Sequence, residues 1–247
     1  MKTFATYNIK GGVGKTATAV NLSYLAARDG YRVLLWDLDP QGAASFLFRI
    51  RPRVKGGGKA LIRGTRPMDD AIKATDFDNL DLLPADFTYR HLDLVLDAAK
   101  KPARRLGSLL APLSAEYDVI FLDCPPGISL LSESVLQAAD GLLVPLIPTV
   151  LSLRTLDQLT EFIGEMNGKR PDVLAFFSMI DRRKRLHLDI ASQLPTERGD
   201  VAATVIPALS LIERMSVERA PVGAFAPRSR AAQSYRQLWD EVKKREL

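Results

Sequence analysis

Short apolar runs alternate with amphipathic stretches along most of the chain. The runs read "TFATYN", "RVLLWDLD", "LDLLPA", "YDVIFLDCPP", "GLLVPLIP", "VLAFFSMID" and "AATVIP". They are apolar nearly throughout, which is typical of parallel strands covered by helices on both faces. A helix is predicted from about Lys15 to Arg28, with Gly30 as its stop. The pattern therefore predicts an α/β fold with a doubly wound, mostly parallel sheet and helices on both faces.

Two later stretches carry apolar residues at helical spacing. The first stripe comprises Leu153, Leu156, Leu159, Phe162, Ile163 and Met166. The second comprises Ala232, Tyr235, Leu238, Trp239 and Val242, and "KKR" follows it. We expect the first stripe to pack in the core. A membrane-surface helix would share the second pattern, but Asp240, Glu241 and Glu246 interrupt its polar side, which favours packing on the domain.

Composition narrows the class of protein. A chain of 247 residues with 47% hydrophobic content fits one large α/β domain, so residues 1–247 are expected to form a single domain. One cysteine and two histidines exclude a disulfide framework and make a zinc or iron-sulfur site improbable. With no signal-peptide core at the N-terminus, a cytoplasmic protein is expected. The net charge of +5 suits contact with a polyanion, either nucleic acid or anionic lipid.

The segment "YNIKGGVGKTATAV", residues 7–20, resembles a phosphate-binding loop with one deviation. In the usual pattern G-x-x-x-x-G-K-[ST] the first glycine would fall at position 9, but this chain has Ile9 there and then Lys10. The glycines let the backbone amides curl around phosphates at the start of a helix. Lys15 is predicted to bind the β and γ phosphates, and the Thr16 hydroxyl to bind Mg²⁺.

Three aspartates follow apolar strands and complete a candidate nucleotide site. Asp123 ends the strand in "VIFLDCPPG" and is predicted to hold Mg²⁺ through a water. Asp37 and Asp39 bracket one leucine in "VLLWDLDPQG", so their carboxylates face the same side of an extended chain. Near a triphosphate, one of these two can steady Lys15 or the metal shell, and the other can orient a water for in-line attack. The alternative is a pair of turn aspartates before Pro40.

Taken together, these motifs resemble the ParA/MinD family of deviant Walker A ATPases, and the ParA/Soj members most. The matching segments are "KGGVGKT", "DLDPQG", "DCPPG", "VIP", "LSLRTLDQL" and "PRSRAAQSYRQL". The resemblance covers nearly the whole chain and implies a P-loop NTPase fold, ATP and Mg²⁺ as cofactors, and a homodimer in the ATP state. A MinD-like, membrane-associated positioning ATPase is the alternative within the family. An electron carrier like nitrogenase iron protein is excluded, because Cys124 alone cannot hold a cluster between subunits.

The resemblance also assigns roles to individual residues. It implies that Lys10 reaches across the dimer to the partner's phosphates, and that Asp39 positions the attacking water. Asp37 and Asp123 belong to the metal and phosphate environment, together with Thr16. The ATP-binding loop comprises Lys10, Gly11, Gly12, Val13, Gly14, Lys15, Thr16 and Ala17. Pro207 is expected to pack against the adenine, and Asp181 to accept a hydrogen bond from its exocyclic amine.

Relatives in this family bind DNA without sequence preference and respond to a partner protein. The expected DNA contacts here are Arg182, Arg183, Lys184 and Arg185. Ala208, Leu209 and Leu211 stand where many ParA proteins have arginines and an asparagine, so contacts could also have moved to Arg214 and Arg219 or to residues 49–68, a basic stretch without acidic residues. A ParB-like protein or cargo adaptor is the expected activator, and the nucleoid the expected location. The sequence does not name the cargo.

Overall fold

The computed structural model describes residues 1–246 and places all of its strands in one eight-stranded sheet. The strand order is β3-β4-β2-β5-β1-β6-β7-β8. The strands are β1 (Lys2–Thr6), β2 (Val33–Asp37), β3 (Lys73–Ala74), β4 (Leu80–Leu83), β5 (Val119–Asp123), β6 (Gly141–Leu146), β7 (Asp172–Ile180) and β8 (Val201–Pro207). Every pairing is parallel except that of β3 with β4, which confirms the predicted sheet. The short edge strand β3 was not predicted.

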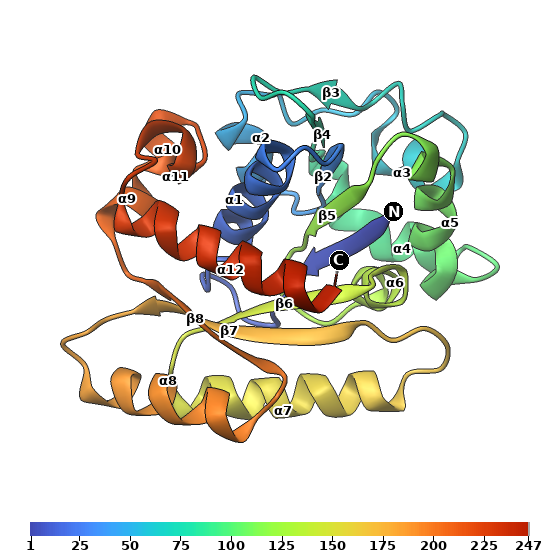
Figure 1. Ribbon diagram of the computed structural model, residues 1–247. Coiled ribbons are helices and arrows are strands. Elements are labelled where there is room, and N and C mark those ends of the chain that lie inside the picture. Colours follow the sequence, from blue (N-terminus) through green and yellow to red (C-terminus); the bar gives the residue numbers. More distant parts are fainter. Residues whose placement is uncertain (247) are drawn as a thin grey trace.

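Helices cover both faces of the sheet (Figure 1). One face packs against α1 (Lys15–Arg28), α2 (Ala43–Leu47), α9 (Ser210–Glu213), α10 (Met215–Glu218), α11 (Val222–Phe225) and α12 (Arg230–Glu246). The other packs against α3 (Gly57–Arg63), α4 (Leu92–Asp97), α5 (Arg105–Leu110), α6 (Leu130–Ala138), α7 (Val150–Glu165) and α8 (Arg185–Glu197). A hydrophobic core lies on each face of the sheet, and successive residues of β2 point into opposite cores: Leu35 packs on the α1 face and Leu34 on the α7 face. No helix within residues 1–246 is long and apolar enough to cross a membrane.

The two apolar stripes have the predicted environments. In α7, Leu156, Leu159 and Ile163 are buried. In α12, the whole predicted stripe is buried against α1 and the sheet, which confirms that the C-terminal helix packs on the domain. Asp29, at the end of α1, holds α12 by accepting hydrogen bonds from Arg236 (2.7 Å), Trp239 (2.9 Å) and Lys243 (2.6 Å).

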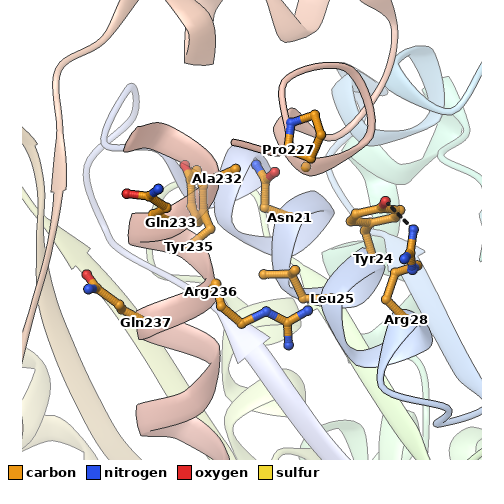
Figure 2. A pocket seen from close by; sticks show the side chains of 11 residues that line it. Asn21, Tyr24, Leu25, Arg28, Pro227, Ala232, Gln233, Tyr235, Arg236 and Gln237 are labelled. Carbon is orange, nitrogen blue, oxygen red and sulfur yellow. Dashed lines mark hydrogen bonds between the residues drawn. The ribbon is translucent and has the colours of Figure 1, made fainter. Parts of the chain in front are cut away.

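A hollow of about 460 Å³ lies between α1 and α12 (Figure 2). Tyr24 and Arg28 approach it from α1, and Gln233 and Arg236 from α12. Asn21 also lines it and joins α1 to α11: its side-chain amide donates to the Ala17 carbonyl (2.7 Å) and accepts from the Val222 amide (2.9 Å). The start of α11 is therefore fixed to the second turn of α1 through Asn21.

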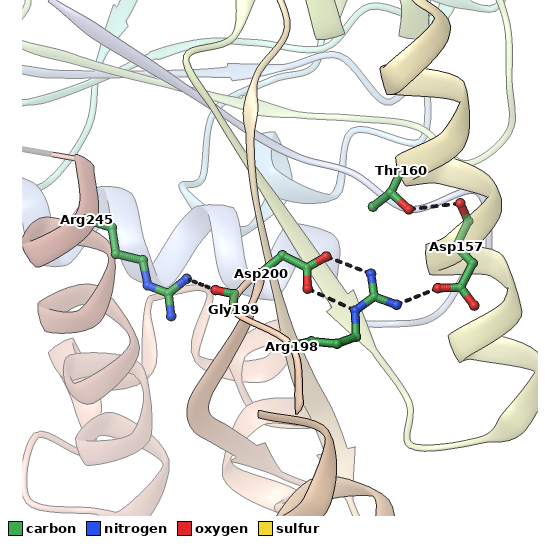
Figure 3. Close-up of polar contacts among 6 residues, drawn as sticks. All are labelled: Asp157, Thr160, Arg198, Gly199, Asp200 and Arg245. Atoms are coloured by element: carbon green, nitrogen blue, oxygen red, sulfur yellow. Dashed lines mark hydrogen bonds and ion pairs between the residues drawn. The ribbon is translucent and has the colours of Figure 1, made fainter. Parts of the chain in front are cut away.

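Arg198 ties α7 to the strand β8 at one edge of the sheet (Figure 3). Its guanidinium donates to both carboxylate oxygens of Asp200, at 2.9 and 2.7 Å, and pairs with Asp157 of α7. Hydrogen bonds from Arg198 and, less strongly, nearby positive charge lower the pKa of Asp200. Arg245 of α12 donates to the Gly199 carbonyl at 2.9 Å, so three elements meet at this point.

Candidate nucleotide site

The loop between β1 and α1 has the backbone of a phosphate cradle. Gly12 and Gly14 have φ angles of 70° and 96°, a left-handed conformation that favours glycine. Gly14 is the N-cap of α1, no side chain caps the helix, and its first turn contains no acidic residue. The free amides of that turn and the helix dipole therefore favour an anion in front of the loop.

Contacts from three other strands hold the loop in place. The Asn8 side chain donates to the Pro145 carbonyl in β6 and accepts from the Lys10 amide, both at 2.8 Å. The Gly127 amide, beyond β5, donates to the Ile9 carbonyl at 3.0 Å. The Ser178 hydroxyl of β7 donates to the Val13 carbonyl at 2.6 Å. Asn8 and Ser178 were not predicted, although Asn8 is the polar residue that closes the first apolar run.

Lys15 is buried at the start of α1, with 7% of its surface exposed. Its ammonium donates a hydrogen bond of 2.9 Å to the main-chain carbonyl of Lys10. Burial lowers the pKa of Lys15, and the nearby carboxylates of Asp123 and Asp39 oppose that shift. A buried cation whose hydrogen-bond acceptor is a neutral carbonyl is stabilised when an anion arrives.

Asp37 and Asp123 are paired residues on the neighbouring strands β2 and β5, and both are fully buried. One oxygen of Asp37 accepts hydrogen bonds from the amide and hydroxyl of Ser45, both at 2.7 Å. Within residues 1–246, its other oxygen has no hydrogen-bond partner, and neither has one oxygen of Asp123. Burial raises the pKa of Asp37 to about 6 and that of Asp123 well above its usual range, and the Asp37 charge adds to the second shift.

These unpartnered oxygens fit a divalent cation. Buried carboxylate oxygens near the Thr16 hydroxyl are the hard donors that Mg²⁺ prefers, and a cation would relieve the repulsion between the two acids. Residues 1–246 contain no group of three or more His, Cys, Asp or Glu side chains that could hold a metal by themselves. The remaining ligands would therefore be phosphate oxygens and water.

Asp39 and Lys10 lie at the rim of the site rather than inside it. Asp39 is half-buried, and one of its oxygens accepts from the Gln41 amide at 2.9 Å. The intervening Leu38 is buried, so the two aspartates around it reach different depths. Lys10 is also half-buried. The structure thus separates a buried pair of acids, Asp37 and Asp123, from two half-buried residues, Asp39 and Lys10.

The ends of β7 and β8 lie together, but Asp181 is already engaged. Ile180 and Pro207 are paired residues, and Pro207 is buried. Both carboxylate oxygens of Asp181 accept from the Arg183 guanidinium, at 3.0 and 2.9 Å. These bonds lower the pKa of Asp181. An adenine amine would have to compete with Arg183 for this carboxylate.

The four basic residues predicted to contact DNA are all exposed, and two of them lie beside aspartates. Arg183 is bound to Asp181, and Arg185 lies 3.7 Å from the Asp189 carboxylate. Within residues 1–246, Arg182 and Lys184 form no ion pair.

A second hollow, of about 710 Å³, opens beside Thr16 and Ala17. Two arginines join its walls: Arg219 donates to the Phe46 carbonyl at 3.0 Å and lies over the Phe46 ring, and Arg49 donates to the Glu218 carbonyl at 3.0 Å. Arg214 pairs with Glu218 in the same segment. Arg214 and Arg219, the alternative positions for DNA contacts, are therefore held in intramolecular interactions.

Comparison with known proteins agrees with this geometry. Residues 1–175 match the family model of an AAA domain. The sporulation initiation inhibitor protein Soj of Bacillus subtilis is 33% identical over 247 residues, which cover 98% of each chain. The chromosome partitioning protein ParA of Caulobacter vibrioides is 32% identical over 254 residues, covering 100% of this chain and 95% of that protein.

A solved structure shows the same fold with a nucleotide. Cobyrinic acid a,c-diamide synthase from Mycobacterium smegmatis, with bound ADP and magnesium, superposes with a TM-score of 0.82 at 26% identity. The alignment covers 99% of this chain and 94% of that one. The glycine loop, the buried lysine and the paired aspartates are the candidate residues for such a site in this chain. With relatives matched along nearly its whole length, the chain belongs to the ParA/MinD family of P-loop ATPases.

Proposed function

We propose that this protein is a Mg²⁺-dependent ATPase that works as a switch. It dimerises on binding ATP, binds non-specific nucleoid DNA in that state, and positions or segregates a cargo such as a chromosome, a plasmid or a protein assembly. Hydrolysis is slow in the protein alone, and a ParB-like or cargo-adaptor protein accelerates it. The partition proteins Soj and ParA, similar over the whole chain, support this class of function.

The observation that carries the proposal is the buried pair Asp37 and Asp123 beside Lys15. Lys15 and the amides of the first turn of α1 hold the phosphates. Thr16, Asp37 and Asp123 would hold Mg²⁺, and the charge of a bound Mg²⁺ would neutralise phosphate oxygens. Asp39, at the rim, orients the attacking water and accepts its proton.

Lys10 is suited to act on a second subunit. The phosphate loop uses only the main chain of Lys10, whose carbonyl accepts from Lys15 and whose amide donates to Asn8. Its ammonium is therefore not needed to build the loop of its own subunit. Delivered to the partner's phosphates, it would stabilise transition-state charge and link ATP binding to dimerisation.

DNA is better supported than a membrane as the surface to which this protein binds. A membrane-associated positioning ATPase anchored by its last helix would need an exposed apolar face, but the apolar face of α12 is buried on the domain. A basic surface present twice in a dimer gains affinity for a polyanion through effective concentration, so ATP would control DNA binding. A cytoplasmic, nucleoid-associated protein follows from this mechanism.

The direct test is binding to labelled non-specific duplex DNA, measured by fluorescence anisotropy. The protein is compared with ATP, with ADP and without nucleotide, at two salt concentrations, and Asp39→Ala is used to hold the ATP state. Binding that requires ATP and weakens steeply with salt is the expected result. Absence of DNA binding by an ATP-bound Asp39→Ala dimer would contradict the proposed function.

A further inference from the structure

A basic groove of about 460 Å³ lies on the face of the domain formed by α3, α4 and α5. Its cations are Arg63, Lys100, Lys101 and Arg105, and none of the described residues that line it carries a carboxylate. In Figure 1 these helices lie at the end of the sheet where β1 begins, away from α9, α10 and α11. We call these four residues the α3–α5 basic groove.

The glycines in "KGGGK" explain how two distant basic segments meet. A Cβ atom on Gly57 would lie 2.7 Å from the Thr88 hydroxyl, and one on Gly58 would lie 2.7 Å from a methyl carbon of Leu92. Only glycine therefore lets α3 lie this close to residues 87–97. The contact places the end of α3 beside the segment that follows α4, some forty residues later in the chain.

Arg105 has a structural role in the groove. Its guanidinium donates to the Ile62 carbonyl in the last turn of α3, where a cation also complements the helix dipole. The other three lining cations, Arg63, Lys100 and Lys101, are exposed. Among the described residues they form no ion pair.

Two further exposed cations extend the basic surface beyond the groove. Lys59 lies one turn before Arg63 on the same side of α3, and Arg104 directly precedes α5. Both are exposed and neither forms an ion pair within residues 1–246. The loop at residues 182–185, in contrast, has two of its four cations paired with aspartates. The larger unneutralised positive surface is therefore the one around α3 and α5.

We propose that the α3–α5 basic groove binds the phosphate backbone of duplex DNA, as a contact surface separate from residues 182–185. This inference rests on the proposed function, which it deepens by naming the surface. Adjacent like charges repel one another, and a chain of phosphates removes that repulsion. Lysine and arginine contacts to phosphates carry no sequence information, so binding through this groove is non-specific.

The test is a triple charge reversal, Arg63→Glu, Lys100→Glu and Lys101→Glu, in the full chain. A matched control, Arg28→Glu, Arg228→Glu and Lys244→Glu, changes three exposed cations on the α1–α12 side by the same charge. DNA affinity with ATP is measured across a salt series, and nucleotide affinity confirms that each variant is folded. The groove variant should lose at least ~10-fold in DNA affinity. The slope of log affinity against log salt concentration, here called the salt slope, should become shallower by about 2 to 3. Both changes should be smaller in the control.

The possible results separate the two proposals. If the unaltered protein binds DNA with ATP and the groove variant binds as well as the control, the groove is not the contact surface, although the proposed function stands. If the unaltered protein with ATP does not bind DNA, the proposed function fails, and this inference fails with it.

Discussion

Asp37 and Asp123 are neighbours on β2 and β5, and each keeps one carboxylate oxygen without a hydrogen-bond partner among the described residues. Two acids buried in one place favour protonation or a cation, because each charge raises the free energy of the other. The site therefore stores a repulsion that a bound Mg²⁺ would release. Occupancy of this site should consequently be visible in the stability of the whole domain.

Without nucleotide, the free energy of unfolding should carry a pH dependence that originates at Asp37. Burial raises the pKa of Asp37 from 3.8 to about 6, so between these values the folded protein keeps a proton that the unfolded chain has released. The associated stability is fully present below pH 3.8 and is lost as the pH rises through about 6. The loss is at most about 3 kcal/mol, and Asp123 extends it to higher pH.

Urea unfolding at pH 5 and pH 8 measures this effect, with Asp37→Asn as the matched variant. The variant should lose less stability than the unaltered protein between the two pH values. Mg²⁺ with nucleotide should reduce the loss in the unaltered protein, because the cation favours the charged acids. An equal loss in both proteins would show that Asp37 is not the titrating group.

Replacing Lys10 by alanine should separate nucleotide binding from dimerisation. The variant keeps the main-chain carbonyl that accepts from Lys15, so ATP affinity should change by less than about threefold, which corresponds to under 1 kcal/mol. ATP-dependent dimers, detected by light scattering, should be lost, and ATP hydrolysis should fall with them. Lys244→Ala, which removes an exposed cation on α12, is the control. Normal dimerisation and hydrolysis by Lys10→Ala would rule out a role for Lys10 across the interface.

Within residues 182–185, the unpaired cations should matter more than the paired ones. Replacing both Arg182 and Lys184 by alanine should reduce the salt slope of DNA binding by about 2, because each phosphate contact contributes about 0.9 to that slope. Removing Arg183 and Arg185 should have a smaller effect, since both already face aspartates. The two double alanine variants are compared in the same anisotropy titration. A larger loss from the second pair would reverse this ranking.

Asp29→Ala should destabilise the protein through the C-terminal helix. Burial raises the pKa of Asp29, but hydrogen bonds from Lys243, Arg236 and Trp239 outweigh it, and the pKa is lowered. The interaction is therefore present above pH 4 and is lost as the pH falls through the lowered pKa. At pH 7 the cost should be about 1–2 kcal/mol in urea unfolding, since three donors lose their charged acceptor. At pH 3 the difference between variant and parent should be smaller, and a constant difference would contradict this account.

The sequence predicted the sheet and the outline of the site because both depend on strong local patterns. Continuous apolar runs mark the buried strands, and the loop from Lys10 to Thr16 has a spacing that few other structures require. Parallel strands place their carboxyl ends at one edge, so Asp37 and Asp123 could be expected near the loop. Their register as direct neighbours, and the role of Ser45, depend on tertiary packing.

Other features were hidden because they arise between residues far apart in the chain or from turn geometry. The contact between Asp181 and Arg183 was not predicted, because it forms once the chain turns after β7. Residues 49–68 differ in composition from the rest of the chain, but this difference did not predict a helix. The helix α3 is short, and contacts with Thr88 and Leu92 fix its position. Ser178 contacts the phosphate loop from another strand, and nothing in the sequence around Ser178 predicts that contact.

The order of the strands has a consequence for the newly made chain. The phosphate loop is encoded within the first sixteen residues, but β1 pairs only with β5 and β6, which begin at Val119 and Gly141. Because it is encoded first, the motif leaves the ribosome well before its supporting strands do, and closing such long loops is slow. A fragment ending before β6 would carry the whole motif but lack Pro145 and Ser178, which hold the loop in place. The phosphate loop therefore acquires its full support after synthesis has passed the middle of the chain.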